Sequence, residues 1–71
     1  MNPNVRRRVR RLLDKGDWPT AIQLAAQAGC DDPIIQAGAL AMSAQIEGWE
    51  MEAIAAVERL HELTEPRHAR R

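Results

Sequence analysis

Residues 12–22 read LLDKGDWPTAI, a stretch that predicts the end of one helix and the start of the next. Gly16 can adopt the left-handed backbone conformation that ends many helices. Asp17 can cap the following helix, and Trp18 and Pro19 can occupy its first turn. Because so few residues separate the two helices, we expect them to pack as antiparallel neighbours. The stretch therefore predicts a helical hairpin.

Helical patterns extend in both directions from this turn. On the N-terminal side, a helix can begin near Asn2-Pro3 or Asn4, and its apolar residues recur at the spacing of one helical face: Val5, Val9, Leu12 and Leu13. On the C-terminal side, a second helix contains Ile22, Leu24, Ala25 and Ala28 and is expected to end at Gly29.

The second half of the chain has similar punctuation. Asp32 and Pro33 mark the start of a third helix, expected over residues 34–47 and stopped by Gly48. This helix carries Leu40, Met42, Ala44 and Ile46. A fourth helix is expected from Trp49 to Leu63, with its apolar face formed by Ala53, Val57 and Leu60 and extended by Ile54.

No segment alternates apolar and polar residues over several positions, so strands are not expected. The predicted fold class is all-α, with four short antiparallel helices arranged as two helix-turn-helix hairpins. One domain is expected over residues 1–66, followed by a flexible basic tail over residues 67–71.

The composition limits the core that this domain can form. The chain has 71 residues, with two Trp, no Phe and no Tyr, and twelve of its apolar residues are Ala. A domain of this size rarely gains more than about 3–5 kcal/mol from one core. Trp18 and Trp49 are expected to anchor that core. We expect the module to gain further stability by docking on itself or on a partner.

An internal repeat relates the two halves of the chain. Gly16-x-x-x-x-Ala21-Ile22 recurs as Gly48-x-x-x-x-Ala53-Ile54 at an offset of 32 residues. This resembles the tetratricopeptide repeat, which has a period of about 34 residues. The resemblance rests on Gly16, Trp18, Ala21, Ala25, Ala28 and Pro33, and then on Leu40, Ala41, Ala44, Gly48, Ala53, Val57 and Leu60.

The chain departs from that family at several positions. Val5 and Ala37 stand where a large aromatic residue is usual, and Trp49 is one place earlier than expected, with Glu50 in the aromatic position. Two units are also fewer than the three or so that normally sustain such a stack. An unrelated four-helix bundle with glycine stops fits the same pattern.

The resemblance implies that the protein binds a peptide or helix in a concave groove lined by the first helix of each unit. Arg6 and Arg10 would face this groove from the first unit, and Gly38, Met42 and Gln45 from the second. Some family members clamp a carboxylate with basic groups from several repeats, but only the two arginines match here. A small apolar groove with a basic rim is therefore favoured.

Charges are sorted along the chain although its net charge is zero. Residues 1–15 carry a net +5, residues 16–52 a net −6, and residues 53–71 a net +1. Such sorting favours either attraction between the two segments, within a monomer or across a dimer, or an external anionic partner.

The basic segment contains five arginines: Arg6, Arg7, Arg8, Arg10 and Arg11. Guanidinium groups suit carboxylates and phosphates. An acidic protein surface or self-association is favoured, followed by a merely solvated face. Nucleic acid is a weaker alternative, because no aromatic residues alternate with the arginines to stack on bases. A membrane surface is weaker still, because the apolar face of this helix has no Trp or Phe and is needed for the core.

No residue pattern points to catalysis or to a cofactor. Glu58-Arg59-Leu60-His61 has the Glu-x-x-His spacing of some metal bundles, but no second pair exists, so no metal is expected. Cys30 is the only cysteine and lies beside two aspartates, which oppose its activation as a nucleophile. A single cysteine and the absence of an apolar leader or span predict a cytoplasmic protein.

The sequence thus predicts a non-catalytic protein–protein interaction module, either an adaptor or a small subunit of a larger assembly. The expected partner has an acidic surface or is an acidic peptide, and the module is expected to form homo- or hetero-oligomers. The predicted contact residues are Arg6, Arg7, Arg10, Arg11, Met42 and Gln45. The alternatives are a nucleic-acid-associated factor that binds phosphates through residues 6–11, and a small inhibitor or regulator protein.

Overall fold

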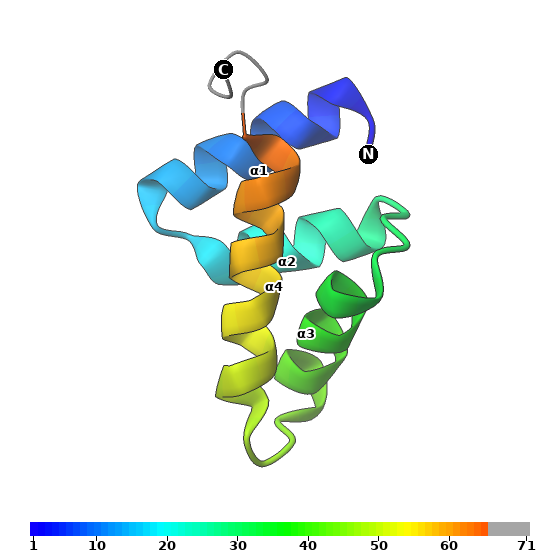
Figure 1. The fold of residues 1–71 in the computed structure, drawn as a ribbon, viewed down its shortest axis with the longest axis vertical. Helices are drawn as coiled ribbons and strands as arrows, with labels where there is room; N and C mark the ends of the chain where they lie inside the picture. The colour runs from blue at the N-terminus through cyan, green and yellow to red at the C-terminus, as the bar shows by residue number, and fades with distance from the viewer. Residues whose placement is uncertain (66–71) are drawn as a thin grey trace.

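The computed structural model describes residues 1–65 and contains helices α1 (Pro3–Lys15), α2 (Trp18–Gln27), α3 (Pro33–Ala44) and α4 (Trp49–Thr64). No strand occurs within residues 1–65, so the all-α prediction is confirmed. The pairs α1–α2 and α3–α4 pack as two hairpins, as expected (Figure 1). Pro66 and the basic tail predicted over residues 67–71 lie outside the described residues.

The turn between α1 and α2 forms as predicted at Gly16. This residue has a φ of 86°, and its N–H donates to the carbonyl of Leu13 at 3.0 Å. The N–H of Asp17 donates to the carbonyl of Leu12 at 2.9 Å, which completes a six-residue helix-ending motif. The carboxylate of Asp17 does not cap α2. Its backbone carbonyl accepts the N–H of Ala21, which is the first hydrogen bond of the helix.

The turn between α3 and α4 differs from the prediction. Asp32 caps α3 as expected, but α3 ends at Ala44, before the predicted Glu47. The left-handed stop is Gln45, with a φ of 52°, and its N–H donates to the carbonyl of Met42 at 3.3 Å. Gly48 is not the stop of α3 but the residue that precedes α4, where it also adopts a positive φ of 85°.

Close packing of α3 on α4 depends on Gly38. A Cβ atom at this position would lie 2.6 Å from Cβ of Ala56 and 3.0 Å from the carbonyl oxygen of Glu52. Only a residue without a side chain fits there, because real Cβ atoms do not approach one another so closely. Gly38 is therefore buried between helices and does not line a groove, contrary to the expectation drawn from the repeat resemblance.

Helix α4 is the central element of the fold. It packs along α3, and it also contacts α1 and α2, so that it spans both hairpins (Figure 1). The helices surround one core: Val9, Leu13, Ala21, Ile22, Ala25, Ile35, Ala39, Ala56 and Leu60. Helices α1 and α3 do not contact each other. The first helices of the two units therefore do not pack against each other.

A charged link ties the start of α3 to α4. Nε of Arg59 donates to Oδ2 of Asp32 at 2.6 Å, and Nη1 of Arg59 donates to Oε1 of Glu62 at 2.9 Å. The other carboxylate oxygen of Asp32 accepts the N–H of Ile34 at 3.0 Å. The hydrogen bond from Arg59 is the main cause that lowers the pKa of Asp32, and the bond from Ile34 acts in the same direction.

Candidate functional site

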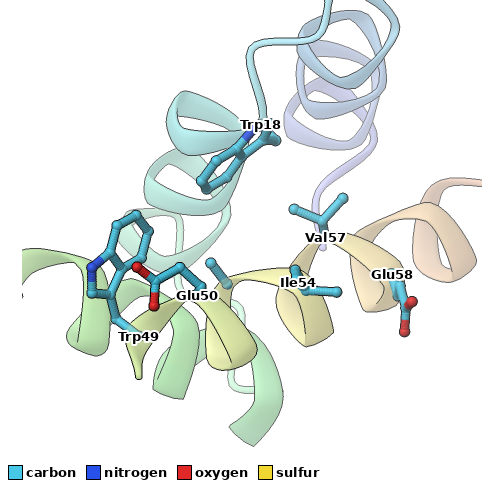
Figure 2. A pocket seen from close by; sticks show the side chains of 7 residues that line it. Trp18, Trp49, Glu50, Ile54, Val57 and Glu58 are labelled. Carbon is cyan, nitrogen blue, oxygen red and sulfur yellow. The ribbon is translucent and has the colours of Figure 1, made fainter. Parts of the chain in front are cut away.

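An apolar groove runs between the start of α2 and the exposed side of α4. We call it the tryptophan groove. Its volume is about 370 Å³, and its lining consists of Trp18, Trp49, Glu50, Ala53, Ile54, Val57 and Glu58. Figure 2 shows Trp49 at one end of the row along α4 and Glu58 at the other, with Trp18 reaching toward the row from α2. This volume falls in the range of pockets that bind ligands or protein side chains.

The local sequence explains how these residues come together. The turn at Gly16 and Asp17 places Trp18 at the first position of α2, where its ring reaches toward α4 (Figure 2). On α4, positions 50, 54 and 58 are one turn apart, and Ala53 and Val57 lie beside them. Because the side chain of Ala53 is too small to fill the space beside the two indole rings, the tryptophan groove remains open.

Both tryptophans are half-buried, which differs from the expectation that they anchor the core. Trp18 packs against the edge of the core, but its ring also forms a wall of the groove. The core is instead filled by Ile22, Ile35, Leu60 and Val9, the largest fully buried side chains. The tryptophans are therefore available to a ligand on one side.

Ile54 departs from its expected burial in a way that bears on function. It stands at the same place in the second repeat unit as Ile22 does in the first. Ile22 is fully buried, whereas Ile54 is 56% exposed. Met51, one turn earlier on α4, is 72% exposed. The apolar surface of the tryptophan groove thus continues onto the open face of α4, where no further helix within residues 1–65 covers it.

Glu50 and Glu58 supply the only charges of the lining. They are eight residues apart on one helix, which corresponds to about 12 Å along its axis. The three ion pairs found within residues 1–65 involve neither of them. The groove therefore has an apolar floor with a carboxylate toward each end.

A second, basic groove of about 390 Å³ lies between α1 and α2. Its lining is Arg8, Arg11, Leu12, Lys15, Thr20, Gln23, Leu24 and Gln27. The three cations recur along one face of α1. Gln27 follows Trp18 by nine residues, which is two and a half turns of α2. The basic groove and the tryptophan groove therefore lie on opposite sides of α2.

The arginines predicted as contact residues have different partners in the structure. Arg6 donates to the backbone carbonyl of Glu65 at 3.1 Å, and Arg7 donates to the side chain of Asn4 at 2.7 Å. Arg10 pairs with Asp14 at 3.4 Å. Arg11 lines the basic groove, together with Arg8 and Lys15, which the site prediction omitted. The spacing of positions 8, 11 and 15 places these three cations on one helical face, and this spacing in the sequence could have predicted their grouping.

Met42 and Gln45 are not brought together with the arginines. Met42 is half-buried against the core, and Gln45 terminates α3. Both lie near the α3–α4 turn, whereas Arg6 and Arg10 contact the far end of α4, at Glu65 and near His61 (Figure 1).

Residues 1–65 contain no group of three or more His, Cys, Asp or Glu side chains that could hold a metal ion. Glu58 lines the tryptophan groove, while Nδ1 of His61 lies 3.4 Å from Nη1 of Arg10, so the two face different surroundings. Within the same residues, no buried side-chain nitrogen or oxygen lacks a hydrogen-bond partner. None of the four helices has the length and apolar character needed to cross a membrane.

Residues 1–65 thus form a small all-helical fold that carries the apolar tryptophan groove and the basic groove on opposite sides of α2. Comparison of the chain with protein-family models, with curated proteins and with solved structures found no match.

Proposed function

We propose that the protein is a non-catalytic protein–protein interaction module, an adaptor or a small subunit of a larger assembly, which docks through the tryptophan groove. The observation that carries this proposal is the continuous apolar surface formed by the groove, Ile54 and Met51. Fully burying such a side chain is worth about 1.5–3 kcal/mol. A partner that covers these two would gain on the order of 1 kcal/mol from each.

The chemistry of the lining supports binding rather than catalysis. The groove offers indole rings, aliphatic groups and two carboxylates, but no hydroxyl, thiol, imidazole or amine side chain. Aromatic residues at the edge of a pocket are typical anchors of protein interfaces, where they contribute much of the binding free energy.

Site-specific photo-crosslinking in cells that produce the protein tests this function. A benzophenone amino acid placed at position 54 should form one discrete adduct with another protein. The same group at Leu40, which is exposed on α3 outside the groove, serves as the matched control. Equal adducts from both positions, or none from position 54, would contradict the proposal.

Nucleic-acid binding through the basic groove is the second candidate. It is supported by Arg8, Arg11 and Lys15 on one face, none of which takes part in an ion pair within residues 1–65. Three phosphate contacts predict a logarithmic salt slope of about −2.7 on duplex DNA. Fluorescence anisotropy with DNA and RNA, for the wild type and for Arg8→Gln/Arg11→Gln, measures this.

An acidic protein segment would suit the same basic groove, as the sequence predicts. If the acidic segment and the nucleic acid share this groove, the segment binds only to protein that is free of nucleic acid. A small inhibitor or regulator would present the same surfaces, and the identity of the crosslinked partner separates it from an adaptor.

A further inference from the structure

We propose that the tryptophan groove accepts a basic amphipathic helix from another protein. Apolar side chains of that helix would insert beside Trp18 and Trp49, while its Lys or Arg residues would pair with Glu50 and Glu58. This inference rests on the proposed function and specifies the chemistry of the partner.

Charge complementarity carries the argument. The floor of the groove is apolar, and its two carboxylates stand toward opposite ends, about 12 Å apart along the helix axis. An uncharged apolar helix would shield both carboxylates from water without supplying a partner, which is costly. A helix with basic residues seven or eight positions apart would instead place a cation near each carboxylate.

The size of the groove also suits a helix. Amphipathic helices dock through apolar residues spaced by three, four and seven positions, which occupy one face over two turns. A volume of about 370 Å³ can hold a few such side chains. Met51 and Ile54 would then contact the flanks of the inserted face. Trp49 would close one end, and Trp18 would face the inserted side chains from α2 (Figure 2).

A second copy of the chain is a poorer occupant. If two copies paired α4 against α4 in antiparallel orientation about Ile54, Glu50 of one copy would face Glu58 of the other. In parallel orientation, each glutamate would face its own counterpart. Both arrangements bring like charges together. The basic helix α1 of a second copy has its apolar residues Val9 and Leu13 buried in its own core, so it has no free apolar side to insert.

Intrinsic fluorescence provides the test, because the chain has two tryptophans and no tyrosine. The probes are two synthetic amphipathic peptides of two heptads each, one built from Leu and Lys and the other with every Lys replaced by Glu. Emission from Trp18 alone is read in Trp49→Phe, and emission from Trp49 alone in Trp18→Phe. We expect the Leu–Lys peptide to shift both emissions to shorter wavelength and to bind at least about tenfold more tightly than the Leu–Glu peptide.

Charge reversal supplies the matched variants. Glu50→Lys/Glu58→Lys should invert the preference, so that the Leu–Glu peptide binds more tightly. Asp31→Lys/Glu65→Lys changes the net charge equally at exposed positions outside the groove, and it should keep the wild-type preference. An inverted preference in this control would show that net charge alone decides binding, which would overturn the inference.

The remaining outcomes separate the two proposals. Equal binding of both peptides to the wild type would overturn the basic partner but leave an apolar docking surface. Binding of neither peptide would overturn the inference, and the absence of a crosslinked adduct at position 54 would then remove the proposed function as well. A concentration-dependent dimer in sedimentation, with a blue shift in the absence of peptide, would assign the groove to a second copy and also overturn it.

Discussion

At the scale of single residues, the backbone conformation and the close approach of neighbouring helices determine which residue fits at certain positions, and side-chain chemistry alone does not. Gly16 could be predicted as a helix stop because glycine adopts a positive φ without strain. Gln45 could not, because glutamine ordinarily avoids that region. Gly38 carried no turn signal, and only the distance to Ala56 reveals why a side chain does not fit there.

Gly38→Ala tests the close packing of α3 on α4. Alanine favours helix formation by about 0.5–1 kcal/mol over glycine, but overpacking costs about 1–3 kcal/mol. We therefore expect a net destabilisation of about 1 kcal/mol in urea denaturation. In a double-mutant cycle, Ala56→Gly should cost less in the Gly38→Ala background than in the wild type, because it removes the nearer contact. A Gly38→Ala variant as stable as the wild type would contradict this packing.

Gln45→Gly tests the strain at the end of α3. Because Gln45 adopts a φ of 52°, a residue without Cβ should relieve a penalty on the order of 1 kcal/mol. We expect a higher free energy of unfolding, although glycine's greater freedom in the unfolded chain reduces the gain. The midpoint of urea denaturation measures it, and a lower midpoint would exclude strain at this position.

At the scale of elements, α4 connects the two hairpins, and its charged link to the start of α3 depends on pH. The pKa of Asp32 is lowered from its ordinary value of 3.8, mainly by the hydrogen bond from Arg59, while burial acts in the opposite direction. A carboxyl whose pKa is lower in the folded state than in the unfolded state stabilises the fold at pH values above its unfolded-state pKa. This contribution is lost as the pH falls through the folded pKa.

Asp32→Asn isolates the charge, because asparagine caps helices about as well as aspartate. The variant should be less stable than the wild type at neutral pH. The difference should shrink below about pH 4 as the wild-type carboxyl becomes protonated. Thermal denaturation at a series of pH values measures both curves. A difference that stays constant down to pH 3 would mean that the ion pair with Arg59 contributes nothing.

The number, type and order of the helices were predictable because each begins or ends near Gly, Pro or Asp. Their tertiary arrangement was not. The helical spacing placed Ile54 on the apolar face of α4, but burial depends on which helix lies opposite, and none covers Ile54 within residues 1–65. Similarly, the arginine run marked α1 as basic, but only the fold separates Arg11, which lines a groove, from Arg6, which donates to the backbone carbonyl of Glu65.

At the scale of the whole molecule, a small alanine-rich core is combined with two exposed grooves on opposite sides of α2. Binding of the Leu–Lys peptide to the folded state alone should raise the thermal midpoint. At ten times the dissociation constant, the gain is about 1.4 kcal/mol, which corresponds to several degrees for a domain of this size. Scanning calorimetry measures the shift. Ile54→Glu should abolish it, whereas Leu40→Glu should not, and an unchanged midpoint in the wild type would contradict stabilisation by docking.

The central claim is that another protein docks in the tryptophan groove, and the two indole N–H signals in a nitrogen-15 correlation spectrum report on it most directly. On titration with the Leu–Lys peptide, the signals of both Trp18 and Trp49 should move and saturate together, while the amides of Thr20 and Gln27 in the basic groove stay in place. Saturable shifts confined to the basic groove, or indole signals that do not move, would contradict the claim.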